Sequence, residues 1–149
     1  MAKFVFELQS ILEIKEKLET QEKMLYASAQ ARLFEEIDKL DNFKNKKISY
    51  ESQMRENMLS GLDVRTLCEC NNGIEIMKDA IKTQQIEVSK AQKNVDIAQR
   101  RLNDAVKERK TYEKLRENAF EDFMQEMNAQ ESKEIDELVS YSYQSGSEE

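Results

Sequence analysis

"MLSGLDV", residues 58–64, interrupts a chain that otherwise reads as continuous helix, and the place where the chain turns decides the fold. Gly61 can take the left-handed backbone conformation that often ends a helix. Asp63 is a suitable N-cap for a helix that follows it. These two residues predict a turn at about 61–63, between one helix on each side.

A second candidate turn lies in "CECNNGIEI", residues 68–76, where Asn71-Asn72-Gly73 is locally the stronger turn signal. The heptad pattern of the second half of the chain runs back through this stretch and places Leu67 and Cys70 on its seam. We therefore favour the earlier turn and keep a reversal at Gly73 as the alternative. With the earlier turn, the asparagines and the glycine form a weak part of a helix.

The second half of the chain holds one heptad phase over a long distance. Positions seven residues apart run from Ile74 to Phe123, and a second set, three residues later, runs from Met77 to Glu126. Twelve of these sixteen residues are apolar, whereas the 39% hydrophobic content of the chain would give about six. A heptad sustained in this way predicts a coiled coil.

The first half is also predicted to be helical, but its apolar seam is less regular. We expect the seam to contain Leu8, Ile11, Leu18, Leu25, Ala29, Leu33, Ile37 and Leu40. Between Leu25 and Leu40 the spacing is closer to an eleven-residue repeat, which predicts a relaxed supercoil. Beyond Leu40, Lys44 and Lys47 fall on the projected seam.

The predicted fold is all-α, a long antiparallel two-helix coiled-coil hairpin. A single helical-hairpin domain would cover residues 1–138, with a helix at about 4–60, a turn at about 61–63 and a helix at about 63–138. Residues 139–149 would form a disordered C-terminal tail. Because a short connection makes the helices antiparallel neighbours, the numbers of opposed residues should add to about 123.

In this register the second helix extends beyond the first. Its extension contains an apolar cluster with no helix predicted opposite: Phe120, Phe123, Met124 and Met127. Exposed apolar patches of this kind mark interaction sites. A partner-binding end is one interpretation, and self-association or a folded-back cap is the other.

Composition excludes several classes of function. The chain has no histidine, two cysteines and a net charge of -7, a combination that argues against a zinc site, a disulfide framework and a general nucleic-acid binder. On a helix Cys68 and Cys70 point about 200° apart, which separates them as ligands. No catalytic residues, cofactor, metal site, signal peptide or transmembrane segment are expected.

Arg109 and Arg116 occupy seam positions and leave two interpretations open. Their stems can pack in the seam while their guanidinium groups reach acidic neighbours at its rim. Alternatively, they are placed to bind carboxylates of a partner.

Four stretches in order resemble the FliJ family of small coiled-coil proteins of bacterial flagellar type III export. They are "FVFELQSILEIKEKLE" (4–19), "MLSGLDV" (58–64), "KNVDIAQRRLNDAVKERKTYEKL" (93–115) and "ESKEIDEL" (131–138). The resemblance covers nearly the whole chain. It implies an antiparallel hairpin similar to the stalk subunit of rotary ATPases.

The resemblance also implies partners: the hexameric export ATPase, the export-gate membrane protein and substrate chaperones. The end that carries both termini would enter the ATPase ring. The residues expected to bind the ATPase are Leu8, Ile11, Leu18, Arg109, Tyr112, Arg116, Phe120 and Phe123. Those expected to bind the gate lie towards the turn and are Phe43, Tyr50, Met77, Ala80 and Gln84. Gly73 and Lys46 stand where the family pattern has large aromatic residues.

The sequence thus predicts a non-enzymatic component of flagellar protein export. As a stalk-like coiled coil, it would link the ATPase ring to the gate and to the chaperones. We expect a monomeric hairpin in the cytoplasm, held peripherally at the inner membrane through the export apparatus. The alternative is a homodimeric coiled-coil scaffold or adaptor unrelated to export.

Overall fold

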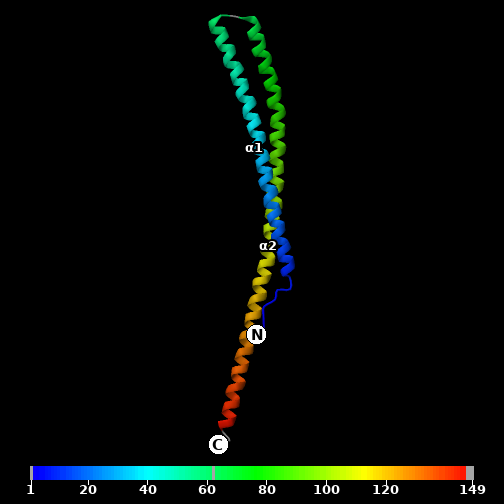
Figure 1. Cartoon of the computed structure of the whole chain (residues 1–149), viewed down its shortest axis with the longest axis vertical. Coiled ribbons are helices and arrows are strands. Elements are labelled where there is room, and N and C mark those ends of the chain that lie inside the picture. Colours follow the sequence, from blue (N-terminus) through cyan, green and yellow to red (C-terminus); the bar gives the residue numbers. More distant parts are fainter. Residues whose placement is uncertain (1, 62, 147–149) are drawn as a thin grey trace. The chain divides into compact units, whose positions relative to one another are not determined.

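The computed structural model describes residues 2–61 and 63–146, and Figure 1 shows its two helices. Helix α1 is Gln9–Ser60 and helix α2 is Val64–Gly146. The described residues contain no strand, and the two helices pack against each other in opposite directions on either side of the connection. The prediction of an all-α, antiparallel helical hairpin is confirmed.

The connection between the helices follows the chemistry of its residues. Gly61 has a φ of 115°, which glycine adopts without the steric cost that a Cβ would bring. Asp63 caps α2, because its Oδ1 accepts the Arg65 amide at 3.2 Å and its Oδ2 accepts the Thr66 hydroxyl at 2.9 Å. Leu62, between them, lies outside the described residues. Residues 64–80 are helical, so the chain does not reverse at Gly73.

Both outer helix boundaries differ from those predicted. Helix α1 begins at Gln9 rather than at about residue 4, because residues 2–6 are non-helical and place Phe4 against α2. Helix α2 runs to Gly146, so residues 139–146 are helical where a disordered tail was predicted. The chain has no proline, and nothing from 139 to 145 forbids a continuing helix. Residues 147–149 lie outside the described part of the chain.

The contacts of the chain group into two compact units, each containing parts of both helices. Unit 1 comprises Met1–Glu19 and Asp104–Glu149, of which residues 2–19 and 104–146 are described. Unit 2 is Thr20–Asn103 and contains the turn. Each unit has its own seam between α1 and α2, and each is described by itself.

In unit 2 the α2 side of the seam follows the predicted heptad. Its buried residues are Cys70, Gly73, Ile74, Gln84, Ala91, Val95 and Ala98. Apart from Gly73, these residues keep one heptad phase, with the half-buried Met77 and Ile81 between Ile74 and Gln84, so the same stripe faces the partner helix throughout. The pairs Gln53–Cys70 and Glu36–Gln84 have numbers that add to 123 and 120, close to the expected register.

The α1 side of the same seam corrects the predicted eleven-residue spacing. The residues that turn inward keep a regular alternation of three- and four-residue steps: Tyr26, Ala29, Leu33, Glu36, Leu40, Phe43, Lys47, Tyr50 and Met54. Leu25 and Ile48 are 54% and 57% exposed. The heptad was hidden because Glu36 and Lys47 occupy two of its positions, so counting apolar residues shifted the predicted seam.

Glu36 is tolerated in the seam because α2 supplies a donor opposite it. Glu36 is 4% exposed. Gln84 Nε2 donates to the Glu36 main-chain oxygen at 2.8 Å and to its Oε2 at 2.5 Å. Arg32 and Lys39 approach the other carboxylate oxygen at 3.1 and 3.6 Å. The hydrogen bond from Gln84, followed by the two cations, lowers the pKa of the Glu36 carboxyl below 4.5.

Gly73 is a packing position, and this explains the glycine within residues 68–76. A Cβ at Gly73 would lie 2.8 Å from the Cε1 and Cζ atoms of the Tyr50 ring, closer than atoms can pack. The aromatic side chain therefore comes from α1, and α2 supplies the space for it. The contact between the Tyr50 ring and the Gly73 backbone offsets the weak helical propensity of this stretch.

We predict that the effect of Gly73→Ala depends on Tyr50. In a Tyr50→Ala background the added methyl has room, and Gly73→Ala should stabilise the fold by about 1 kcal/mol through helix propensity. With Tyr50 present the ring must shift, and that gain should disappear or reverse. Urea unfolding of the four proteins measures the coupling. Equal effects in both backgrounds would contradict the packing role of Gly73.

We also predict that Glu36 contributes to acid sensitivity. Because its pKa is lowered in the folded state, its stabilisation is complete above the unfolded-state pKa and is lost as pH falls through the folded value. Glu36→Gln should therefore be less stable than wild type at pH 7, with a difference that shrinks towards pH 3. Thermal unfolding over this range, with the exposed neighbour Glu35→Gln as control, is the measurement. A difference that stays constant with pH argues against the role assigned to Glu36.

Candidate functional site

Unit 1 contains the seam that leads to both chain ends. On α1 the inward residues are Leu12, Lys15 and Glu19, again in steps of three and four, and Leu8 continues this series just before the helix begins. Leu12 is the most deeply buried, at 1% exposed. Ile11 and Leu18, predicted for the seam, are 36% and 39% exposed and lie beside it. Their apolar side chains therefore remain partly accessible.

Charged side chains cross the unit 1 seam in two ion pairs. Arg109 binds Glu19, which is 7% exposed, through its Nε, and binds Glu113 through a second guanidinium nitrogen at 2.8 Å. Hydrogen bonds to Glu113 and to Glu19 raise the pKa of Arg109. Lys15 donates to Glu108 Oε2 at 2.9 Å, which raises the pKa of Lys15.

The Lys15 ammonium also lies 5.9 Å from the centroid of the Tyr112 ring, within cation–π range. The first interpretation of Arg109, a packed stem with its head on acidic neighbours, is therefore the one observed. Tyr112 is half-buried, and its ring lies next to Lys15 in the seam.

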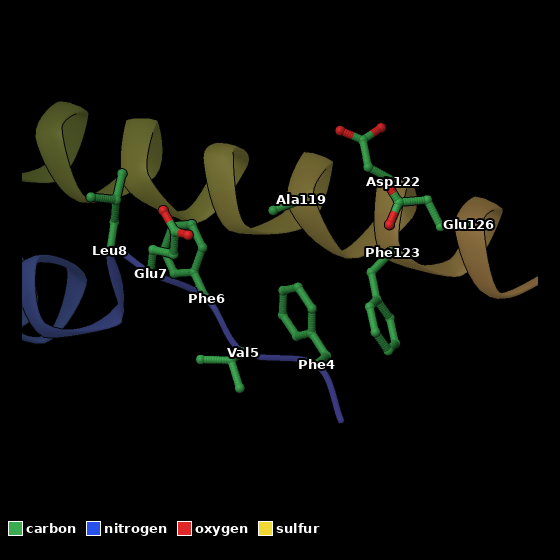
Figure 2. Close-up of a pocket in the computed structure, with 9 residues that line it drawn as sticks. All are labelled: Phe4, Val5, Phe6, Glu7, Leu8, Ala119, Asp122, Phe123 and Glu126. Atoms are coloured by element: carbon green, nitrogen blue, oxygen red, sulfur yellow. The ribbon is translucent and has the colours of Figure 1, made fainter. Parts of the chain in front are cut away.

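Three aromatic rings pack together where the N-terminal segment meets α2 in unit 1. The Phe4 ring stands edge-on to Phe120, with centroids 5.2 Å apart at 80°. It is tilted against Phe123 at 5.5 Å and 53° (Figure 2). Such pairs are stabilised by their quadrupoles in addition to apolar burial. The predicted apolar cluster on α2 is thus partly covered by the non-helical N-terminal segment, the folded-back cap of the second interpretation.

Two open hollows flank the Phe4 ring. One, of about 360 Å³, is lined by residues 4–8 and by Ala119, Asp122, Phe123 and Glu126 (Figure 2). The other, of about 480 Å³, is lined by Phe4, Phe120, Arg116 and two glutamates. Phe120 and Met124 are still 47% and 42% exposed. The surface therefore keeps unfilled apolar volume beside a cation, Arg116, whose side chain is exposed.

From residue 128 onwards α2 is exposed along its whole described length. Residues 128–146 are all exposed, including Ile135, Leu138 and Val139. This end is strongly acidic: residues 120–149 carry nine carboxylate side chains and one lysine, while residues 1–119 carry 22 basic and 21 acidic side chains. The whole excess negative charge of the chain is therefore concentrated here.

The structure brings all eight residues expected to bind the ATPase into unit 1. Leu8, Arg109, Tyr112 and Phe123 are half-buried, and Ile11, Leu18, Arg116 and Phe120 are exposed. Phe4 and Phe6 were missed at the sequence level. The alternation in "FVFEL", with aromatic residues two apart, was the available signal, because an extended segment buries every second side chain.

The five residues expected to bind the gate lie in unit 2, and their side chains are largely committed to the seam. Phe43, Met77 and Ala80 are half-buried, and Tyr50 packs on Gly73. Gln84 is 7% exposed and donates to Glu36. Their role in binding a partner stays a prediction.

The cysteines, the potential metal ligands and the apolar stretches of the described residues were the other candidates for a functional role. Cys70 is buried with its Sγ 3.8 Å from Gln53 Oε1, whereas Cys68 is exposed, as their opposite directions on a helix predict. Among residues 2–61 and 63–146, no three potential ligands from His, Cys, Asp and Glu gather to hold a metal ion. None of the described helices has an apolar stretch long enough to cross a membrane.

Comparison with known proteins gives two matches. A family model described as the flagellar FliJ protein matches residues 4–148. Among solved structures, a putative YscO homolog from Chlamydia trachomatis matches with a TM-score of 0.51 and 22% identity, over 99% of this chain and 99% of that chain. At this identity the structural match supports the helical fold alone. No curated protein matches the sequence.

We predict that the two seam arginines differ in what they stabilise. Arg109→Ala removes the cation facing the buried Glu19 and should lower the thermal unfolding midpoint by about 5 °C or more. Arg116→Ala, at an exposed position one heptad further on, should leave it unchanged. Circular dichroism melts of both variants test this, and equal midpoints would show that the Glu19 contact contributes nothing to stability.

Proposed function

Since the chain belongs to the FliJ family and is a component of flagellar type III protein export, we propose that it binds the ring of the export ATPase through the aromatic surface of α2 in unit 1. From there it would link the ATPase to the export gate and to substrate chaperones. This role is non-enzymatic, and the chain would act in the cytoplasm at the inner face of the membrane. The observation that carries the proposal is the incompletely covered aromatic surface of α2 at Phe120 and Phe123.

The shape and chemistry of this surface suit a protein partner. Aromatic and methionine side chains dominate the cores of protein interfaces, and Phe120 and Met124 are both accessible. The apolar surface around Phe120 can accept side chains from a second protein, and the exposed Arg116 beside it can pair with a carboxylate there. An anchor in an apolar pocket next to an exposed charge is the arrangement from which binding hot spots are built.

The charge distribution specifies the partner further. A surface with the net acidity of residues 120–149 attracts a basic surface and repels a second copy of itself. A ring whose lumen presents lysine or arginine side chains fits this end. The charge complementarity would raise the association rate at low salt and lose that effect as salt screens it.

The gate and chaperone contacts are proposed for unit 2 and for exposed residues of both helices. Because Gln84 and Tyr50 are occupied in the seam, the accessible apolar side chains near them are better candidates for direct contact. These include Ile48, Ile76 and Ile86, which are 57%, 62% and 58% exposed. Phe43, Met77 and Ala80 would support such a surface from beneath.

We predict that Phe120→Ala weakens binding to purified export ATPase by about tenfold or more, because it removes the central apolar anchor. Removing residues 120–149 should abolish binding. The matched control is Phe34→Ala, which truncates a 62% exposed phenylalanine of unit 2 and should bind like wild type. Surface plasmon resonance gives the affinities, and wild-type affinity of the chain that lacks residues 120–149 would exclude this end as the ATPase-binding site.

A further inference from the structure

Residues 2–8 lie against α2 as a non-helical segment, here called the N-terminal strap. Phe4, Phe6 and Leu8 are half-buried, while Val5 is 75% exposed and Glu7 is exposed. Figure 2 shows Phe4 and Phe6 pointing towards α2 and Val5 pointing away. This period of two belongs to an extended chain, so the strap presents one apolar face to the surface proposed for the partner.

The strap is fastened mainly by side chains. In the described part of the molecule, its backbone hydrogen bonds are Gln9 N–H to the Phe6 oxygen at 3.1 Å and Leu12 N–H to the Leu8 oxygen at 3.0 Å. Both belong to the start of α1 and neither reaches α2. The strap therefore depends on the Phe4 contacts with Phe120 and Phe123, together with the burial of Phe6 and Leu8.

The fit between strap and surface is loose. Open hollows of about 360 and 480 Å³ flank the Phe4 ring, and Phe120 remains 47% exposed beneath it. Unfilled volume means lost van der Waals contacts on both sides of the ring. A partner that replaces the strap can also cover the part of Phe120 that the strap leaves exposed, and therefore gains more contacts from the same α2 surface.

A helical form of the same segment would not reproduce the contact. Continuing the α1 heptad backwards from Leu8 and Leu12 places Val5, rather than Phe4 or Phe6, on the seam. Docking both aromatic residues requires the extended form, so the docked strap and a longer α1 are mutually exclusive arrangements.

We propose that the N-terminal strap is an autoinhibitory contact, which covers part of the partner-binding surface in the free protein and is displaced when the partner binds. This inference rests on the proposed function, because the partner displacing the strap is the export ATPase. A surface that is free only part of the time binds with an affinity reduced by that fraction. A strap docked for about 70–90% of the time weakens apparent binding by roughly 3- to 10-fold.

The test is the affinity of Phe4→Ala for purified export ATPase. Releasing the strap should tighten binding by about 3- to 10-fold, since Phe120 and Phe123 become permanently accessible. Val5→Ala is the matched control, because its side chain points away from α2, and it should bind like wild type. Unchanged or weaker binding of Phe4→Ala overturns the inference, because Phe4 would then be neutral or itself part of the partner contact.

A second measurement follows the strap directly. The chain has no tryptophan, so Phe4→Trp introduces a single reporter. In the free protein its emission should be blue-shifted, and it should shift to the red when Phe120→Ala is added or when the ATPase binds. The wild-type chain with ATPase serves as the blank. Fully solvated emission in the free protein overturns the docked strap.

The two proposals fail in distinguishable ways. If Phe120→Ala loses binding but Phe4→Ala gains none, the binding site stands and the strap is not inhibitory. If adding Phe120→Ala to Phe4→Ala, in which the strap is already released, leaves binding unchanged, the binding site is wrong. The competition between strap and ATPase is then overturned with it, whatever the emission of Phe4→Trp.

Discussion

The packing of α1 against α2 along a heptad seam is the constraint on which the other features depend. In both units the inward positions of α1 keep steps of three and four residues even where the side chain is charged. The opposite helix compensates, with Gln84 facing Glu36 and Arg109 facing Glu19. Burying an ionised group is costly unless a partner reaches it, so these pairs fix which residues of the two helices stand opposite each other.

The sequence predicted α2 better than α1, for a physical reason. Along α2 the seam is mostly apolar, so its period is visible by counting. Along α1 the seam includes the charged residues Lys15, Glu19, Glu36 and Lys47. The first three are paired with Glu108, Arg109 and Gln84, which lie far away in the chain. The sequence of one helix does not indicate which residues of the other helix will pair with it. The predicted seam therefore contained Ile11, Leu18 and Leu25, which are exposed. The turn was predictable because Gly61 and Asp63 act through local backbone chemistry.

The candidate site was predictable in position but not in composition. The excess length of α2 followed from register arithmetic, and it located the cluster around Phe120. That the cluster is covered by Phe4 did not follow, because the segment was assigned to the helix on its apolar content. Similarly, Gly73 was predicted to weaken the helix, because the Tyr50 ring that packs against it belongs to the other helix. In each case the deciding contact joins residues on different helices or segments.

The Tyr50–Gly73 contact also bears on how the helix pair of unit 2 responds to force. Sliding α2 by one heptad in either direction would bring Thr66 or Ala80 under the ring in place of Gly73, and each carries the Cβ that Gly73 lacks. The Tyr50 ring therefore fits over α2 in one register only. It resists slip between the two helices, and so favours bending or rotation of the pair as a whole. Such a pair can pass on a displacement applied at one place without losing its registration.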